Sequence, residues 1–517
     1  MSANVNGFGI DAPVKGLRAA YTDSYISFLY AGSSVTGPAA ASVTKDTGIL
    51  LATKKLSTAG DSISTTLSGA SNGFDLGHTV SGDGYVVLDS DIGNDAFSVT
   101  QVPDVNGDLT AGLEGVFIGK GNTFRTGRIL TDAEISLKTK LLDNDSFNIV
   151  LSGNNSIGIE VESTGTLDYG PGNDRTVVTA PITVINRKAV PLELSGFNNV
   201  AIWNKGTINA GLGSDTIVGD GAFRGIWNTG TIDLGAGADR IDGYADEAYV
   251  PFNTDFKVKK QFNADQDAFD KAELNQQGTG RPVNKTLAGI YNEKGATIKT
   301  YEGDSDNDKD VIMGIGSGHT AVVKASYDQN APGIYNAGTI KMGNGADVVD
   351  ALSGGFFGNG TYELARFGSV DSDRDSVTGY GSGTFYAGGG LDNLTLPAGW
   401  YFIDYTGEIP TSTTSPVTAN LYRTETGGEL AALVPATKTD QQIKDAMKID
   451  SFEGIAGFNP SAAAGGHFWS TANGALGALQ VDSNGFIHTY SKAALETAPT
   501  EVGGLTALFS KLGLGAF

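Results

Sequence analysis

Hydrophobic and polar residues alternate in short stretches along most of this chain, which is the two-residue period of β-strands. The middle of the sequence repeats one such stretch: an Ile-Trp/Tyr-Asn segment, a turn containing glycine, and a second segment with Thr-Ile. A fainter copy runs from Gly158 to Leu167. The four clear copies are Ala201 to Ile208, Gly225 to Ile232, Gly289 to Ile298 and Gly333 to Ile340.

Most copies are followed at once by a second glycine-rich turn that ends in aspartate and leads into a third apolar segment. The repeating unit is therefore strand, glycine turn, strand, glycine-rich turn, strand. These turns are Gly211 to Asp215, Gly235 to Asp239 and Gly343 to Asp347, with relatives at Gly170 to Asp174 and Gly388 to Asp392.

The closest copies place Ile202 and Ile226 about one turn of a parallel β-helix apart, and longer spacings leave room for inserted loops. Stacked coils put like residues on like, so each row of the repeat has one predicted role. We expect Ile202, Ile226, Ile290 and Ile334 on one face and Trp203, Trp227, Tyr291 and Tyr335 on the other. We expect an asparagine ladder at Asn204, Asn228, Asn292 and Asn336, and positive φ at Gly206, Gly230, Gly295 and Gly338.

The pattern thus predicts an all-β chain with a central right-handed parallel β-solenoid (β-helix) at residues 151–400. Residues 1–150 form a β-rich N-terminal region whose alternating runs, such as Ala96 to Val99 and Ser146 to Val150, cap or prefix the solenoid. Residues 401–517 form a small mixed module with a short helix at Thr439 to Lys448. The insertion segment Asn263 to Leu274 is predicted to be helical or disordered.

Composition narrows the function. Among 517 residues, 58 Asp and Glu face 35 Lys and Arg, a formal charge of −23, which disfavours binding to nucleic acid or to anionic lipid. The absence of cysteine excludes disulfides and thiolate metal sites. No apolar run is long enough to predict a transmembrane segment.

Three short runs carry oxygen ligands at alternate positions. Several carboxylates in one tight loop repel each other unless a cation lies between them, and calcium suits such a loop best because it accepts six to eight oxygens in flexible geometry. Lys309 and Ile315 occupy the positions where an EF-hand loop has glycine and glutamate, so the first run does not match an EF-hand. The other interpretation is a solvated acidic loop. The candidate ligands are Asp304, Asp306, Asp308 and Asp310; Asp371, Asp373 and Asp375; and Asp104, Asn106 and Asp108.

The Gly-x-Gly-x-Asp-x-Ile pattern at Gly211 to Ile217, Gly235 to Ile241 and Gly343 to Val349 resembles the calcium-binding repeats of haemolysin-type (repeats-in-toxin) proteins, a repeat shared by several bacterial S-layer proteins and adhesins. The resemblance implies calcium bound between coils, with Asp215, Asp239 and Asp347 as ligands and Asp174 and Asp392 as further ones. The family repeats its motif every nine residues, whereas here it occurs once per coil, so these aspartates are alternatively turn formers.

The same resemblance implies type I secretion through an uncleaved C-terminal signal. Consistent with this, Met1 to Gly32 lacks the basic start of a secretory signal, and Leu505 to Phe517 places apolar residues on one helical face. A terminal helix docked on the core is the alternative for that last segment. The expected location is extracellular, on the bacterial cell surface.

The sequence favours a secreted structural protein, not an enzyme, that self-assembles into a homo-oligomer or polymer such as an S-layer or filament, with calcium ordering its acidic turns. One alternative is an adhesin that binds a glycan, such as a surface polysaccharide, through Trp203, Trp227 and the inserted loops. A second alternative is a β-helix polysaccharide lyase or hydrolase. We treat the GxSxG match at Gly69 to Gly73 as chance, because it has no strand-turn-helix context.

Overall fold

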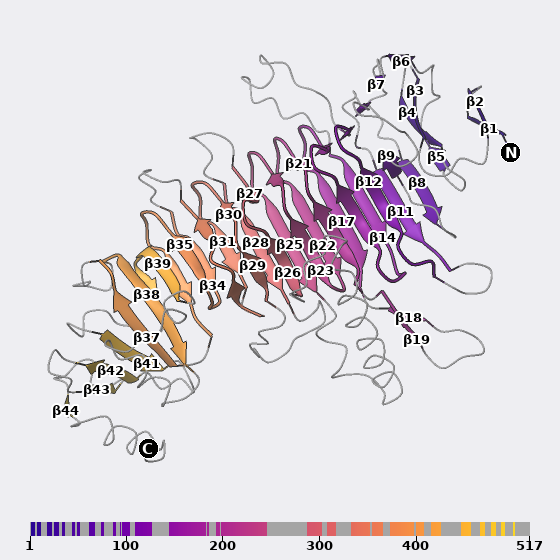
Figure 1. Cartoon of the computed structure of the whole chain (residues 1–517). Coiled ribbons are helices and arrows are strands. Elements are labelled where there is room, and N and C mark those ends of the chain that lie inside the picture. Colours follow the sequence, from indigo (N-terminus) through magenta and orange to yellow (C-terminus); the bar gives the residue numbers. More distant parts are fainter. Residues whose placement is uncertain are drawn as a thin grey trace, which may run out of the picture.

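The computed structural model of the chain is a long stack of short β-strands wound into a parallel solenoid (Figure 1). Three sheets form its faces, and consecutive strands of the chain usually belong to consecutive sheets. The structure describes residues 67, 94, 96–103, 109–126, 144–181, 196, 198–245, 287–301, 308–316, 332–351, 354–365, 373–397, 403, 406–407, 415–423 and 446–455, and elsewhere gives strand bounds alone.

The three sheets are named A, B and C here, in the order in which the chain passes through them within one coil. Sheet A contains β5 (Ser34–Thr36), β8 (Ser62–Leu67), β11 (Ala96–Gln101), β14 (Ser146–Val150), β17 (Arg175–Ala180), β22 (Thr216–Gly221), β25 (Arg240–Ala245), β28 (Val311–Ile315), β31 (Val348–Asp350), β34 (Ser376–Thr378), β36 (Asn393–Thr395) and β40 (Gly454–Ile455). Sheet B contains β9 (Phe74–Leu76), β12 (Glu114–Ile118), β15 (Ile157–Val161), β20 (Val200–Asn204), β23 (Arg224–Asn228), β26 (Ala288–Asn292), β29 (Ile334–Asn336) and β32 (Phe356–Phe357).

Sheet C is the longest. Its parallel part contains β10 (Val86–Leu88), β13 (Thr123–Arg125), β16 (Thr166–Asp168), β21 (Thr207–Asn209), β24 (Thr231–Asp233), β27 (Thr297–Lys299), β30 (Thr339–Lys341), β33 (Thr361–Glu363), β35 (Gly383–Tyr386) and β39 (Met447–Phe452). It continues through antiparallel strands β38 (Val417–Thr424), β37 (Trp400–Tyr405), β41 (Gly466–Ser470), β42 (Gly477–Val481), β43 (Ile487–Ser491) and β44 (Thr500–Glu501).

Four antiparallel pairs lie outside the three sheets. They are β1 (Ser2–Val5) with β2 (Phe8–Asp11), β3 (Arg18–Thr22) with β4 (Tyr25–Leu29), β6 (Thr44–Asp46) with β7 (Ile49–Leu51), and β18 (Thr183–Ile185) with β19 (Glu193–Ser195).

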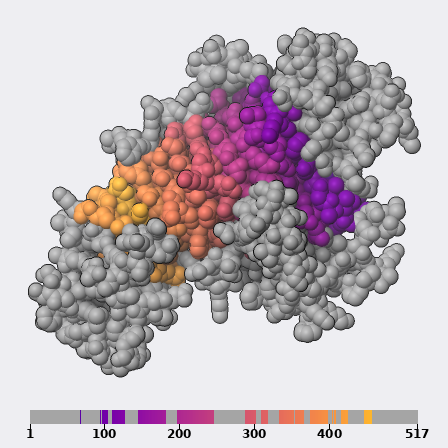
Figure 2. All heavy atoms as spheres, viewed as in Figure 1, coloured from indigo at the N-terminus to yellow at the C-terminus, as the bar shows by residue number. Residues whose placement is uncertain are grey.

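The all-β fold and the parallel solenoid predicted from the repeat are confirmed. The register pairs Ile202 with Ile226, Trp203 with Trp227 and Asn204 with Asn228, so equal positions of the repeat stack directly on each other. Figure 2 shows the described coils as one continuous band from indigo to yellow. Parallel pairing also joins β8, β11 and β14 to the same stack, so the predicted strands at Ala96 to Val99 and Ser146 to Val150 prefix the repeat region.

The core is the interior of the coil. In the parallel strands whose side chains the structure describes, one or two side chains point inward, and these side chains make continuous apolar rows. In the coil around Ile226 the three inward residues are Ile217, Ile226 and Ile232, which are at most 2% exposed. Toward the N-terminal end aromatic rings replace the isoleucines, with Phe97 stacked on Phe147 at 4.9 Å between ring centroids.

The glycines between sheets B and C need their small size for a reason other than the predicted one. Of the four, Gly295 has positive φ (87°), whereas Gly206, Gly230 and Gly338 do not. A Cβ atom on Gly230 would lie 2.1 Å from the carbonyl oxygen of Gly206 in the adjacent coil, and Gly206 and Gly338 meet similar oxygens. The tight stacking of coils, and not a left-handed backbone, therefore excludes side chains at these three positions.

The C-terminal part continues the β-structure. Met447 and Lys448 lie in β39, so the predicted helix is wrong at its end; residues 439–445 lie outside the described residues. The antiparallel strand β38 pairs with β39 and extends sheet C beyond the last parallel strand. The predicted segments Asn263 to Leu274 and Leu505 to Phe517 also lie outside the described residues. In the part that the structure describes, no helix is long and apolar enough to cross a membrane.

Candidate functional site: the aspartate corner

The corner between sheets C and A carries a column of eight buried aspartates, one from each successive coil. All are at most 3% exposed. The backbone N–H of each of the first seven aspartates donates to the Oδ1 atom of the aspartate in the next coil, with N···O distances of 2.7–2.9 Å. The column, called the aspartate column below, consists of Asp145, Asp174, Asp215, Asp239, Asp310, Asp347, Asp375 and Asp392.

The column ends on a glutamate. The backbone N–H of Asp392 donates to Oε2 of Glu453 at 3.0 Å, so Glu453 takes the place of a ninth aspartate. Each member directly precedes a strand of sheet A, where the backbone turns into the next face. A carboxylate oxygen there satisfies a backbone N–H that the turn would otherwise leave buried.

A shorter polar ladder runs beside the column, one residue earlier in each coil. The backbone N–H of Asn144 donates to Oδ1 of Asn94, that of Asn173 to Oδ1 of Asn144, and that of Ser214 to Oδ1 of Asn173. These bonds run along the outer, exposed side of the corner. The corner is therefore fixed by two side-chain ladders, one inside the wall and one outside it.

The two sequence motifs that predicted calcium converge on this one corner. Asp310 and Asp375, which end two of the acidic runs, occupy the same column as Asp215, Asp239 and Asp347 of the glycine turns. From Asp239 to Asp392 glycine turns and acidic runs alternate from coil to coil. A Cβ atom on Gly345 would lie 2.0 Å from the carbonyl oxygen of Asp308, and one on Gly390 equally close to that of Asp373, so glycine lets these coils stack.

The members of each acidic run face different environments. Asp308 is exposed and Asp373 is half-buried, while Asp310 and Asp375 are buried. Among the described residues, no three acidic or histidine side chains lie together so as to hold a metal ion. Oδ1 of Asp215, of Asp239 and of Asp347 each accepts a hydrogen bond from a backbone N–H. Asp104, Asn106, Asp108, Asp304, Asp306 and Asp371 lie outside the described residues.

Electrostatics within the column are unfavourable for charge. Two unit charges at the ordinary strand spacing of about 4.8 Å repel by about 3 kcal/mol at an effective dielectric constant of ~20. Burial raises the pKa of Asp215 to about 7, although the hydrogen bond from the Asp174 backbone opposes this shift. Burial likewise raises the pKa of Glu453. Burial and the nearness of further carboxyl groups therefore both disfavour charge at Asp215.

Two hydroxyl groups are placed against the column. Thr300 Oγ1 donates to Oδ2 of Asp310 at 2.5 Å. Tyr169 forms a hydrogen bond with Thr176 and lies near Asp145, Asp174 and Asp215; burial first, and then these carboxylates, raise its pKa. Neither hydroxyl group brings a positive charge to the column, and Thr300 donates directly to one of its carboxyl groups.

The corner between sheets B and C carries the predicted asparagine ladder. Nδ2 of Asn204 donates to Oδ1 of Asn228 at 2.9 Å, and Asn228 and Asn292 repeat this bond in the following coils. Each of these Nδ2 atoms also donates to a backbone carbonyl of the next coil, such as that of Thr231 at 2.8 Å. The predicted ladder is confirmed, and its members are fully buried.

The outer face of sheet B carries the predicted aromatic row. Trp203 stacks on Trp227 and Tyr291 on Tyr335, each at 4.3 Å between ring centroids. Trp227 is 2% exposed and its Nε1 donates to Glu293, while the buried Arg224 guanidinium lies 4.1 Å from the Trp227 ring. These rings form a second apolar cluster outside the coil, and Trp227 is closed to a sugar.

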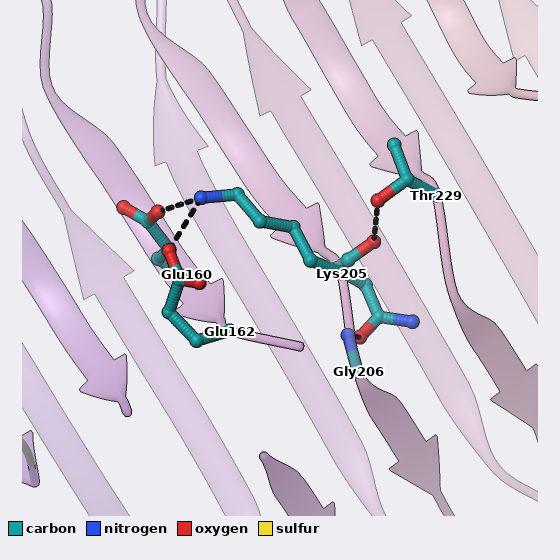
Figure 3. Close-up of polar contacts among 6 residues, drawn as sticks. Glu160, Glu162, Lys205, Gly206 and Thr229 are labelled. Carbon is teal, nitrogen blue, oxygen red and sulfur yellow. Dashed lines mark hydrogen bonds and ion pairs between the residues drawn. The ribbon is translucent and has the colours of Figure 1, made fainter. Parts of the chain in front are cut away.

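Lys205 joins two coils beside the asparagine ladder (Figure 3). Its Nζ atom donates to Glu160 at 2.5 Å and to Glu162 at 2.7 Å, and lies 3.7 Å from the centroid of the Trp203 ring. Burial opposes ionisation of Lys205 and Glu162, but their mutual attraction is stronger, so the pKa of Lys205 is raised and that of Glu162 is lowered.

Comparison with known proteins found no match among family models, curated sequences or solved structures. The sequence identified seven of the eight column members as acidic turn residues and missed Asp145. The signal that unites them is an aspartate two residues before an inward-facing residue of sheet A, as in Asp145-Ser-Phe147 and Asp239-Arg-Ile241.

Proposed function

We propose that this chain is a secreted structural protein of the bacterial cell surface that self-assembles into a layer or filament, with calcium ordering its acidic turns. The observation that carries the proposal is the alignment of the acidic runs. The described ends of two runs, residues 308–310 and 373–375, are far apart in sequence but enter the same corner of one rod, separated by a single glycine turn. A rod that repeats one acidic feature along its length suits repeated contacts with further copies.

The calcium part of the proposal rests on the outer members of these runs. Asp308 and Asp373 are accessible, and two coil rises separate them, about 10 Å at the usual strand spacing. That distance is too long for one ion to bridge both, so each run would hold its own ion with its neighbouring oxygens. Calcium would then offset the charge of the runs and order the loops that carry contacts between copies.

Light scattering of the full-length protein, stripped with a chelator and titrated with calcium, tests the proposal. We expect large particles with calcium and none with magnesium, and a loss of this growth in the double variant Asp308→Asn, Asp373→Asn. Asp350→Asn is the matched control, because Asp350 lies on the outer face of sheet A away from the corner. Scattering that stays at the monomer value at every calcium concentration would show that calcium-driven assembly is wrong.

The aromatic row does not favour the adhesin alternative. A sugar-stacking strip needs open ring faces, but Trp227 is buried among Trp203, Arg224 and Tyr291. A glycan-binding measurement on the same chelated protein distinguishes the alternatives, because an adhesin would bind glycan as a monomer.

A further inference from the structure

We propose that the outer face of sheet C is the surface on which two copies of this chain pack, as an antiparallel pair related by a two-fold axis. The inference rests on the proposed function in that it assumes self-assembly, and it names one contact surface, but it requires no calcium. The face is formed by the outward side chains of β13, β16, β21, β24, β27, β30, β33 and β35, and is called the sheet C face below.

One row of the sheet C face is threonine in eight successive coils. The parallel register stacks these threonines directly on each other, and each is half-buried. In the part of the chain that the structure describes, their hydroxyl groups form no hydrogen bonds with other residues, so they keep donors and acceptors for a facing surface. The row consists of Thr123, Thr166, Thr207, Thr231, Thr297, Thr339, Thr361 and Thr384.

The second row of the sheet C face is electrically neutral, although the chain carries a formal charge of −23. Three basic side chains balance three acidic ones, and each basic group is paired along the row, at N···O distances of 2.6 to 3.1 Å. A strongly negative chain repels its own copies, so a neutral face is where two copies approach at the least electrostatic cost. From the N-terminal end the row contains Arg125, Asp168, Asn209, Asp233, Lys299, Lys341, Glu363 and Tyr386.

The order of charges in the second row fits its own reverse. A two-fold axis along the strand direction, through the coil of β24, lays each row on its counterpart with the coils in opposite order. Arg125 then faces the partner's Glu363, Asp168 faces the partner's Lys341, and the axis repeats both contacts. Asp233 is the one charged residue of the row that meets a like charge, and the ion pair that it makes within its own row offsets this repulsion.

The size of the sheet C face predicts a contact that is weak in a pair and strong in an array. Eight coils at the ordinary strand spacing of about 4.8 Å make a face about 34 Å long, and a strand with its flanking residues spans about 15 Å. Two copies would bury about 1,000 Å² in total, which is near the lower limit for a specific interface. Many such contacts act together in a layer or filament, whereas a single pair has to be trapped chemically.

Cross-linking of single-cysteine variants tests the inference, because the chain has no cysteine of its own. In the chelated full-length protein, a short bifunctional thiol reagent should link two copies of Thr231→Cys, since Thr231 lies on the proposed axis. Thr384→Cys is the matched control, because it belongs to the same row but lies at the end of the face, far from its counterpart. Equal linking of the two variants, or no linking of Thr231→Cys, would overturn the inference.

An exchange of charges in the Thr231→Cys background supplies a second test. Arg125→Glu places like charges opposite each other at both ends of the pair, so cross-linking should fall roughly tenfold. Adding Glu363→Arg restores opposite charges between the copies and should restore cross-linking, although within each copy it breaks the further ion pair of Lys341. A double variant that links no better than Arg125→Glu alone would show that these charges act within one copy, and the inference would be wrong.

The outcome is separable from that of the calcium titration. If scattering does not grow with calcium but Thr231→Cys links, the proposed calcium-driven assembly is wrong and the pair stands. If calcium produces growth but Thr231→Cys links no better than Thr384→Cys, assembly uses another face and the pair is wrong. Absence of linking, together with retention on insoluble cellulose that Thr231→Arg abolishes, would assign the face to a polysaccharide and likewise overturn the pair.

Discussion

The solenoid has a buried polar residue at two of its corners: asparagine between sheets B and C, and aspartate between sheets C and A. Both make one hydrogen bond per coil along the axis. An asparagine amide donates and accepts, so Asn228 accepts from Asn204 and donates to Asn292 by side chain alone. An aspartate side chain has no amide donor, so Asp215 does not continue a side-chain ladder, and its Oδ1 accepts from the Asp174 backbone N–H.

Because of this difference, the hydrogen bonds of the asparagine corner do not depend on pH, whereas the charge of the aspartate corner does. The asparagine ladder has the same charge at every pH and satisfies its amide groups within the wall. The aspartate column satisfies backbone N–H groups but gathers buried acidic groups, and burial raises the pKa of Asp215 to about 7, so the stability of this corner depends on pH. The asparagine corner therefore stabilises the coil equally at every pH, whereas the contribution of the aspartate corner changes with pH.

The largest expected effect comes from placing an aspartate in the asparagine corner. Asn228→Asp removes the donors to Oδ1 of Asn292 and to the carbonyl oxygen of Thr297, and it buries a carboxylate against acceptors. We expect a loss of about 3 to 5 kcal/mol in the free energy of unfolding at pH 7. Urea unfolding at pH 7 and pH 4 measures it, with a smaller loss at pH 4 because the new group is then protonated.

The reverse exchange is the control. Asp239→Asn keeps the oxygen that accepts from the Asp215 backbone, so it should cost no more than about 1 to 2 kcal/mol at pH 7. If Asp239→Asn destabilises more than Asn228→Asp, the distinction between the two corners is wrong.

Glycine substitutions at the asparagine corner come next. Gly230→Ala places a Cβ atom 2.1 Å from the Gly206 carbonyl oxygen and should cost about 3 kcal/mol, since the coils must separate. Gly295→Ala meets nothing within 4 Å but has φ of 87°, so it should cost about 1 kcal/mol. Thermal unfolding of both variants measures the two losses. Equal losses would mean that backbone conformation, and not coil stacking, requires glycine at this corner.

The asparagine corner was predictable from sequence because its signal is compact. Ile-Trp/Tyr-Asn, a glycine and Thr-Ile fall within one short segment, so the copies align by eye and the stacking of Asn204 on Asn228 follows from the repeat. The solenoid itself followed from the same alignment. Conversely, the reason for glycine at Gly206 and Gly230 was not predictable, because it is the close approach of the adjacent coil and not positive φ.

Seven of the eight members of the aspartate column were named from the sequence, but their alignment in one column was not predicted. Successive members are separated by between 17 and 71 residues, because loops of different length leave the coil between them. The members also sit in two kinds of motif, glycine turns and acidic runs, whose shared feature is only the aspartate before an inward strand. The sequence predicted calcium from the clustered carboxylates. It did not predict that Asp310 is buried while Asp308 is exposed, because that depends on where the coil wall runs.

A smaller effect is expected where a neutral donor supports the column. Thr300→Val removes the hydroxyl that donates to Oδ2 of Asp310 and should cost about 1 to 2 kcal/mol. Thr297→Val is the control, because Thr297 is half-buried on the outer face of sheet C. Calorimetric unfolding at pH 5 measures both, and a loss at Thr297 as large as at Thr300 would show that the hydroxyl bond is unimportant.

The smallest effect should come from the charged group beside the asparagine ladder. Lys205→Met removes the ion pairs with Glu160 and Glu162, and partial exposure limits the loss to about 1 kcal/mol. Because the pairing lowers the pKa of Glu162, its contribution is complete above the unfolded pKa of glutamate and fades as the pH falls through the folded value. The difference between Lys205→Met and the unaltered chain, measured by urea unfolding, should therefore shrink below pH 4.

Lys341→Met is the matched control for Lys205, since its pair with Glu363 is more exposed and should contribute less. The pH trend of the Lys205 difference runs opposite to that of the aspartate column, because acid weakens the surface pair and strengthens the buried carboxyl groups. An unfolding midpoint that increases toward acid in the unaltered chain, while the Lys205 difference decreases, would assign the two trends to their separate corners. If both decreased together, surface ion pairs and not the interior column would set the pH response of the rod.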